Sequence, residues 1–215
     1  MRKIGIFGGS FDPIHYGHLR PALEILSTLS LDEIRFIPAG QPPHRGVPAA
    51  SAALRLDMVK AAIAGEPRFV VDEREVRRSA PSYTVDTLTE LRREFPRDAL
   101  MLIVGMDAFL GFPGWHEWLK IFDFAHVIVA HRPGWVLQSG GDLAETIRRR
   151  RAKSAQEIVT VLAGCILMQP VTQLEISSTQ VRASIAAGGD PRYLVPETVR
   201  ELILNSHCYA KHTEH

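Results

Sequence analysis

The feature that most constrains the fold is a regular alternation of short apolar runs with segments of helical periodicity. Continuous apolar runs such as "KIGIF" (3–7) and "ALMLIVG" (99–105) predict buried strands. The segments between them repeat apolar residues three and four positions apart, as in 19–29. Strands separated by helices predict βαβ crossovers and a parallel sheet with helices on both faces. The predicted strands are 3–7, 33–39, 68–72, 99–105, 126–131 and 164–169.

The strand-like apolar runs end before the C-terminal part of the chain, where the sequence predicts a small helical portion over about 177–209. Apolar spacing marks one short helix around 181–185, and Pro196 suits the first position of another. No linker rich in glycine or serine divides residues 1–215, so we expect one domain. The segment 134–156 is predicted to be the least ordered.

Composition excludes several classes of protein. The 215 residues carry a formal net charge of +1, so no overall field favours nucleic acid or an acidic membrane surface. The arginine run 148–151 is predicted to be a solvated helix face. No apolar run is long enough to span a bilayer, and Cys165 and Cys208 form no CxxC unit. We therefore expect a cytoplasmic protein that binds any anion at a local site.

The stretch "GGSFDPIHYGHLRP" (8–21) follows the first predicted strand and suits an anion. In an open parallel sheet, ligands collect beyond the carboxyl ends of the strands. Gly8 and Gly9 allow a close approach of the backbone, and a helix starting near Gly17 directs its positive end to the same place. The dinucleotide fingerprint GxGxxG is absent, because residues 10–13 fill its place.

Two histidines sharpen this interpretation. His15 and His18 flank Gly17 at the predicted helix start, where a ligand can approach without meeting a Cβ. An adjacent phosphate would favour the cationic form of an imidazole, whose ordinary pKa is about 6.5. Two such donors would hold an α-phosphate and a departing pyrophosphate. Zinc is the weaker alternative, because no third ligand is evident from the spacing.

The string "GGSFDPIHYGH" resembles the first motif of the HxGH nucleotidyltransferases, and the other motifs are similar to those of the bacterial nicotinate-nucleotide adenylyltransferases. The likeness runs from Lys3 to about Tyr209. It implies an α/β, Rossmann-like doubly wound parallel sheet with a small C-terminal helical part. It also implies a reaction of NAD biosynthesis, in which ATP, with Mg²⁺, and nicotinate mononucleotide give deamido-NAD and pyrophosphate.

The resemblance assigns further site residues. "PPHR" (42–45) is a rigid basic loop after the second strand, and "ISSTQVR" (176–182) brings hydroxyls and a guanidinium to a helix start. "GMD" (105–107) ends the strongest strand and would contact adenosine. The implied catalytic residues are His15, His18 and Arg182. The implied ATP-binding residues are Gly8, Gly9, Ser10, Phe11, Gly17, Gly105, Asp107, Ser177 and Ser178. The implied substrate-binding residues are His44, Arg45, Tyr83, Thr84, Thr87, Trp115 and His116, and no metal is held by protein ligands.

Two segments would form the pyridine pocket. "PSYTVDTL" (81–88) opens a helix that Ser82 or Thr84 would cap, and its first N–H groups suit a carboxylate. The resemblance implies that the backbone near Thr87 receives the nicotinate carboxylate. In "GWHEW" (114–118), Trp115 is predicted to stack on the pyridine and Trp118 to pack in the core. The family usually has an aromatic residue after the first tryptophan, where this chain has a histidine.

Alternatives remain at this level. The acceptor would otherwise be nicotinamide mononucleotide or phosphopantetheine, although the phosphopantetheine enzymes are typically shorter and lack the tryptophan segment. A different class, a non-catalytic nucleotide sensor on the same fold, is disfavoured because both histidines and the basic loop are intact. We expect no nucleic acid or membrane partner, and the residues fit a monomer or a homodimer equally.

Overall fold

The computed structural model describes residues 1–43, 46–132, 140–158 and 160–210. Its six strands form one sheet in the order β3-β2-β1-β4-β5-β6, with every neighbouring pair parallel. This order reverses between β1 and β4, which makes that position the topological switch point. The strands are β1 (Lys3–Gly9), β2 (Glu33–Pro38), β3 (Phe69–Val71), β4 (Ala99–Gly105), β5 (His126–His131) and β6 (Ile166–Pro170). The predicted fold class is confirmed.

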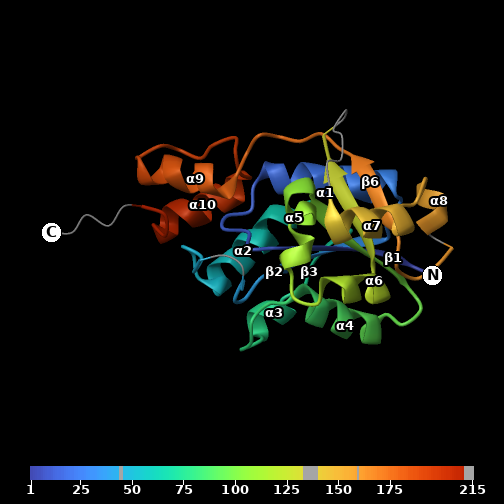
Figure 1. The fold of residues 1–215 in the computed structure, drawn as a ribbon. Helices are drawn as coiled ribbons and strands as arrows, with labels where there is room; N and C mark the ends of the chain where they lie inside the picture. Colours follow the sequence, from blue (N-terminus) through green and yellow to red (C-terminus); the bar gives the residue numbers. More distant parts are fainter. Residues whose placement is uncertain (44–45, 133–139, 159, 211–215) are drawn as a thin grey trace.

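The strands send alternate side chains to two separate apolar layers. In β4, Leu100, Leu102 and Val104 join one buried cluster, whereas Met101 and Ile103 join the other. Figure 1 shows α1 on one side of the sheet and α4 with α6 on the other. The first layer of helices is α1 (Tyr16–Thr28), α2 (Ala52–Ile63), α8 (Ala155–Ile158) and α10 (Glu197–Ser206). The second is α4 (Thr84–Glu94), α5 (Met106–Leu110), α6 (Ile121–Phe124) and α7 (Gly141–Arg150).

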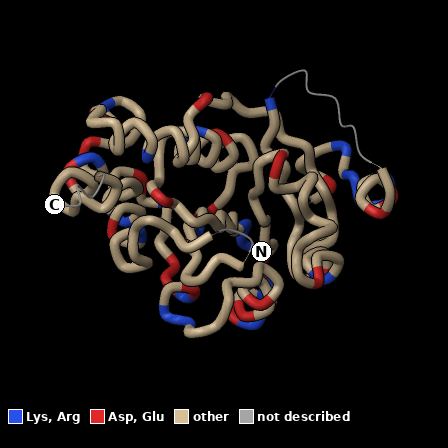
Figure 2. The backbone as a smooth tube through the Cα atoms, turned by 60° about the vertical axis from the view of Figure 1, so that its left-hand side comes forward, with Lys and Arg blue, Asp and Glu red and all other residues tan. Residues whose placement is uncertain are grey.

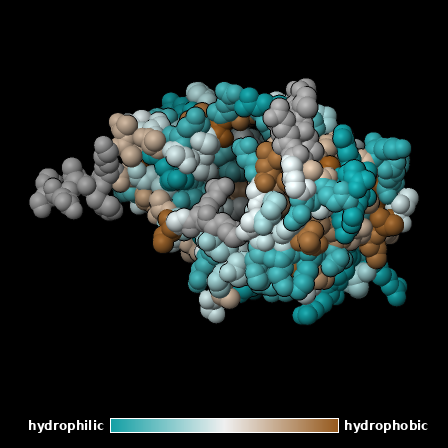
Figure 3. All heavy atoms as spheres, viewed as in Figure 1, coloured by the Kyte–Doolittle hydropathy of each residue, from teal (hydrophilic) through white to brown (hydrophobic). Residues whose placement is uncertain are grey.

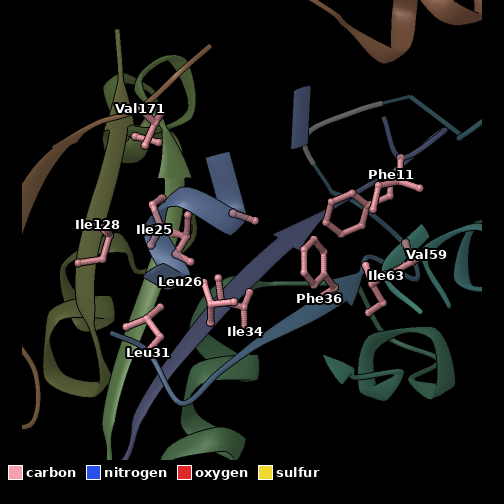
Figure 4. Close-up of a cluster of buried hydrophobic side chains, with 14 of the residues drawn as sticks. Phe11, Ile25, Leu26, Leu31, Ile34, Phe36, Val59, Ile63, Ile128 and Val171 are labelled. Atoms are coloured by element: carbon pink, nitrogen blue, oxygen red, sulfur yellow. The ribbon is translucent and has the colours of Figure 1, made fainter. Parts of the chain in front are cut away.

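The first layer is continuous with the turn that follows β1. Figure 4 shows the Phe11 ring directed at Phe36 of β2, beside Val59 and Ile63 of α2. The centroids of the two phenyl rings lie 6.0 Å apart. Phe11 has a φ of 47°, so the backbone of the turn leaves the extended conformation where this ring enters the core. The turn is therefore held in place by the packing of the Phe11 ring in the first apolar layer.

The C-terminal helical part is formed by α9 (Ser178–Ala186) and α10. Ser177 caps α9 by accepting a hydrogen bond from the Gln180 amide at 3.2 Å. Pro196 lies at the N-cap of α10, one position before its predicted place. The Thr198 hydroxyl donates to the Ala61 carbonyl at the end of α2, which joins this part to the first helical layer.

The segment predicted to be the least ordered contains two helices. Residues 133–139 lie outside the described residues, but α7 and α8 follow, and Leu143 and Ile147 of α7 are buried. That expectation is wrong where α7 forms, because its apolar residues at i and i+4 reach the second layer. The arginine run is solvated at Arg148 and Arg149, which pair with Glu145 on the helix surface as predicted. Arg150 departs from that prediction, because it is half-buried, donates to the Gly164 carbonyl and packs over the Phe122 ring. Figure 2 shows acidic and basic residues interspersed along the backbone.

Several short helical elements escaped the sequence analysis, each too short for a periodic pattern: α3 (Arg74–Arg77), α5, η1 (Phe112–Gly114), η2 (Trp118–Lys120), α6 and α8. Among the described residues, no helix combines the length and the apolar character that crossing a bilayer requires. Cys165 and Cys208 are free thiols.

Candidate active site

A cavity of about 780 Å³ opens at the carboxyl ends of the strands, at the switch point. Figure 3 shows it as a hollow between the C-terminal helices and the rest of the face in view. The turn after β1 and the start of α9 form one end of its wall, and the start of α4 with the segment around Trp115 forms another. Gly105, at the end of β4, also lines it. The cavity therefore joins segments from both ends of the chain.

The turn after β1 leaves no room for a side chain at Gly17. A Cβ there would lie 2.9 Å from the His15 ring and 2.9 Å from the Ile176 carbonyl oxygen. A Cβ at Gly8, by contrast, would meet nothing within 4 Å. The glycine between the two histidines is thus required by close packing against the segment that leads into α9, whereas Gly8 leaves backbone open to the cavity.

The two histidines of the turn form a stacked pair. Their ring centroids lie 3.8 Å apart, with 30° between the planes. His18 Nδ1 accepts a hydrogen bond from the His15 backbone N–H at 3.3 Å, so the neutral His18 ring carries its proton on Nε2. The Phe11 ring packs edge-on to His18, with centroids 5.3 Å apart. These contacts fix the orientation of the pair.

His15 is buried without a complete set of partners. Only 3% of the residue is exposed, and its Nδ1 has no hydrogen-bond partner among the described residues. Burial lowers the pKa of His15 from 6.5 to about 4, so the ring is neutral at pH 7. A buried ring nitrogen without a partner is costly, and an anion in the cavity would both satisfy it and favour its protonation.

Helix α9 is bonded directly to the turn. The Ser178 hydroxyl donates to the Pro13 carbonyl at 3.0 Å, and Arg182 Nη1 donates to the Asp12 carbonyl at 2.6 Å. The Asp12 carboxylate accepts from the Tyr209 hydroxyl at 2.7 Å. Ser177, Ser178 and Arg182 all line the cavity. The segment 176–182 is therefore held beside the turn after β1.

Aromatic rings form the other end of the cavity. Tyr83 and His116 face each other with centroids 4.4 Å apart, and Trp115 packs against Phe112 at 4.6 Å. Trp115 lines the cavity, whereas Trp118 packs edge-on to a phenyl ring of the second layer. Trp118 is half-buried against the second layer rather than inside the core, so its prediction is met only in part. Trp115 is the tryptophan that a flat ring in the cavity would meet.

A buried carboxyl organises the start of α4. The Thr87 hydroxyl donates to Glu75 Oε1 at 2.6 Å, and burial raises the pKa of Glu75. Ser82 does not cap α4, nor does Thr84: the Ser82 hydroxyl oxygen accepts from the Gly40 amide at 3.0 Å and so binds the end of β2. That cap prediction is wrong, because a partner distant in sequence takes the hydroxyl.

The backbone N–H of Thr87 donates to the Tyr83 carbonyl within the helix. The amides that lack a helical acceptor are therefore the first two of α4, those of Thr84 and Val85. They are the donors that this helix start offers to a carboxylate.

The structure brings together most of the predicted site residues. Asp107 is an exception: it lies exposed on the first turn of α5 and is not among the described residues that line the cavity. His44 and Arg45 lie outside the described residues. Phe11 lines the cavity but sends its ring into the core. The other predicted residues that line the cavity are Gly8, Gly9, Ser10, His15, Gly17, His18, Tyr83, Thr84, Thr87, Gly105, Trp115, His116, Ser177, Ser178 and Arg182.

Sequence reasoning missed three buried polar groups of the site, those of Asp12, Arg55 and Glu75. One signal was present for Arg55, which stands at i and i+4 spacing with Val59 on the apolar stripe of α2. A cation on such a stripe is unusual and points to buried partners. Nothing comparable marks Glu75.

Comparisons with known proteins agree with this geometry. The family model described as cytidylyltransferase-like matches residues 6–184. A relative from Halorhodospira halophila, named a probable nicotinate-nucleotide adenylyltransferase, is 48% identical over 97% of this chain and 96% of its own. One of the same name from Dechloromonas aromatica is 47% identical over 96% and 97%.

A solved structure shares the fold. The nicotinic acid mononucleotide adenylyltransferase of Plasmodium falciparum, complexed with NaAD, superposes with a TM-score of 0.71 at 19% identity, over 97% of this chain and 98% of that one. At this identity the likeness concerns the fold alone. The close relatives carry the assignment, and the chain belongs to the cytidylyltransferase-like family and, within it, to the nicotinate-nucleotide adenylyltransferases.

Proposed function

We propose that this protein transfers the adenylyl group of ATP to nicotinate mononucleotide, giving deamido-NAD and pyrophosphate. The observation that carries the proposal is a single cavity with the stacked His15–His18 pair at one end and the Trp115 face at the other. One end suits phosphates and the other suits a flat ring. The names of the close relatives support the same reaction.

The chemistry is one in-line displacement. An oxygen of the mononucleotide 5′-phosphate attacks the α-phosphorus of ATP, the new P–O bond forms, and the bond from the α-phosphorus to the bridging oxygen breaks. Pyrophosphate leaves with that bonding pair, and no covalent enzyme intermediate is needed. Catalysis then consists of positioning both phosphates and stabilising the charge that develops on them.

The histidine pair acts on the α-phosphate and the departing pyrophosphate. The unliganded His15 ring is neutral, because burial lowers its pKa to about 4. A bound triphosphate supplies the missing partner of His15 Nδ1 and raises that pKa by its negative charge. The positive charge therefore arises on the ring only when the phosphates are present.

Helix α9 and the loop after β2 complete the phosphate contacts. Ser177, Ser178 and the Arg182 guanidinium hold the β- and γ-phosphates at the start of α9, where they line the cavity. His44 and Arg45 steady the 5′-phosphate of the incoming nucleotide, as the resemblance implies. Asp107 contacts the adenosine ribose, also by resemblance.

The aromatic end binds the pyridine. Trp115 stacks on the ring, and the amides of Thr84 and Val85 at the start of α4 receive its carboxylate. Tyr83 and His116 close the wall beside it. This arrangement favours the acid mononucleotide over the amide, because helix-start amides prefer an anion.

When bound with ATP, Mg²⁺ would be held by the substrate phosphates and would supply neutralisation of their charge. Within the described ranges, no three histidine, cysteine or acidic side chains are grouped to bind a metal. Asp12, which lines the cavity, already accepts from the Ala49 and Ala50 amides and the Tyr209 hydroxyl. We place the reaction in the cytoplasm, where the free thiols Cys165 and Cys208 persist.

A pyrophosphate-release assay tests the proposal. The purified protein is given MgATP with nicotinate mononucleotide, nicotinamide mononucleotide or phosphopantetheine, and the dinucleotide product is identified by mass. We expect release with nicotinate mononucleotide and a clear preference for it when the two mononucleotides compete. Release only with phosphopantetheine, or with none of the three, would refute the assignment.

A further inference from the structure

Arg55 of α2 is a buried cation that the reaction described above does not use. It is 1% exposed, and no carboxylate lies within ion-pair distance of it among the described residues. Burial lowers the pKa of its guanidinium, which the charge of Asp12 partly offsets. A buried guanidinium without an ion pair is tolerated only when its donors are satisfied by other acceptors.

The donors of Arg55 bond three backbone carbonyl oxygens. Nη1 donates to Ser10 at 2.6 Å, Nε to Ala50 at 3.2 Å and Nη2 to Gly40 at 3.3 Å. Ser10 belongs to the turn after β1, the triphosphate end of the cavity. Gly40 and Ala50 are the two ends of the loop between β2 and α2, which lines the same cavity. One guanidinium therefore bonds the turn after β1 and both ends of the loop after β2.

Asp12 completes this connection from the other side. Its carboxylate accepts from the Ala49 amide at 2.8 Å and the Ala50 amide at 3.0 Å. The backbone at the end of the loop is thus held through its N–H groups by the turn after β1 and through a carbonyl by Arg55. These bonds leave little freedom for one segment to move relative to the other.

We propose that Arg55 is a positioning residue that sets the distance between the two phosphate-binding segments for in-line attack; the inference rests on the proposed function. In the proposed reaction, the turn after β1 holds the triphosphate and the loop after β2 holds the 5′-phosphate of the mononucleotide. The reacting oxygen and phosphorus, however, must meet within about 3–3.5 Å, and a shift of about 1 Å costs roughly 10²-fold in rate. Loss of Arg55 therefore acts on turnover more than on the binding of either substrate.

The planar fork of arginine is what the position requires. Lysine keeps the charge, but its ammonium group cannot reach three carbonyls that are arranged around a guanidinium plane. The chain offers a matched control in Arg92 of α4, whose pKa burial also lowers. Its guanidinium likewise donates to backbone carbonyls, those of Phe95, Asp98, Phe124 and Leu162. Asp98 and Phe124 precede β4 and β5, so Arg92 lies at the amino ends of the strands.

The experiment compares Arg55→Lys with Arg92→Lys. Single-turnover rates at saturating substrates are measured well below both melting temperatures, together with the Kd of a non-hydrolysable ATP analogue and of nicotinate mononucleotide. We expect Arg55→Lys to lower the rate by roughly 10- to 100-fold, with each Kd changed by less than about threefold. Arg92→Lys should lose stability and keep its rate.

Three results would overturn the inference: an unchanged rate in Arg55→Lys, an equal loss of rate in Arg92→Lys, or a loss confined to binding. If the lysine variant does not fold, Arg55→Met keeps the side-chain volume without the guanidinium and should show the same rate loss. Failure of both variants to fold would show that Arg55 is required for folding only.

Wild-type activity is judged separately. If the wild type uses another phosphate acceptor, only the proposed substrate is wrong, and the comparison is made with that acceptor. A wild type without any transfer refutes both proposals.

Discussion

A histidine is buried at each end of the parallel strands, and the two histidines differ in their hydrogen bonds. His15 lies beyond the carboxyl end of β1, and His126 begins β5 at the amino ends of the strands. Burial lowers the pKa of both to about 4. His126 Nε2 bonds the Val161 carbonyl at 3.1 Å and its Nδ1 accepts from the Cys165 amide at 3.2 Å. Among the described residues, His15 Nδ1 has no such partner.

The difference teaches that burial and a shifted pKa do not by themselves mark a functional residue. The two imidazoles share those properties, and what separates them is hydrogen-bond satisfaction. The complete bonds of His126 join the start of β5 to the segment before β6, which is a structural role. The incomplete set at His15 leaves a place that a ligand can fill.

Replacing the imidazoles at the carboxyl ends of the strands should give the largest effect, a loss of kcat. We expect His15→Ala and His18→Ala each to lower kcat by roughly 10²–10³, the scale of removing one charge-stabilising donor. Steady-state assays with MgATP and nicotinate mononucleotide measure it. Unchanged turnover in either variant would remove that histidine from the mechanism and break the contrast with His126.

The second-largest effect is on the pH dependence of the free energy of unfolding. Both histidines are held neutral in the folded chain, so between pH 6.5 and about 4 the unfolded chain binds protons that the folded chain does not. Stability therefore falls as the pH falls through this window, by about 3 kcal/mol for each histidine when complete. Urea titrations from pH 7 to pH 4 should show the wild type losing about that much more than His126→Leu. Parallel curves for the two proteins would contradict the assignment.

His126→Leu at pH 7 should cost stability alone. The substitution leaves the Val161 carbonyl and the Cys165 amide without their side-chain partner, at about 2 kcal/mol. Urea unfolding measures the loss, and kcat measured well below the melting temperature should equal that of the wild type. A drop in kcat comparable with that of His15→Ala would mean that the two ends of the strands are not functionally separate.

The smallest effect extends the comparison to the aromatic end of the cavity. Trp115→Ala should raise KM for nicotinate mononucleotide roughly tenfold and leave KM for ATP unchanged, because a stacking face is lost. Trp118→Ala is the control, since that ring packs in the second layer and should affect stability instead. A change confined to the KM for ATP would show that the pyridine lies elsewhere.

Most of the fold could be predicted from the sequence, because long apolar runs and helical repeats are local signals. "ALMLIVG" is strand β4, and all six predicted strands form. The errors fall where local signals compete with distant partners. The segment that contains α7 was expected to be the least ordered, yet Leu143 and Ile147 are buried in the second layer. Ser82 looked like a helix cap and binds the end of β2 instead.

The site was predictable where glycine, histidine and hydroxyl residues cluster in short motifs, and less so where single residues act through distant contacts. The stacked pair of His15 and His18 follows from one string of letters. The partners of Asp12 include Tyr209, 197 positions away, and no spacing rule connects them. Arg55 likewise depends on carbonyls that only the folded chain brings together.

The bond between Tyr209 and Asp12 also has a consequence during synthesis. The carboxylate that steadies the turn after β1 receives its phenolic donor from a residue added almost two hundred peptide bonds later. Helix α9, which donates to the same turn through Ser178 and Arg182, is translated late as well. The turn that carries the histidine pair is therefore fully bonded only after Tyr209 has been added, well after the residues of all six strands have been synthesised.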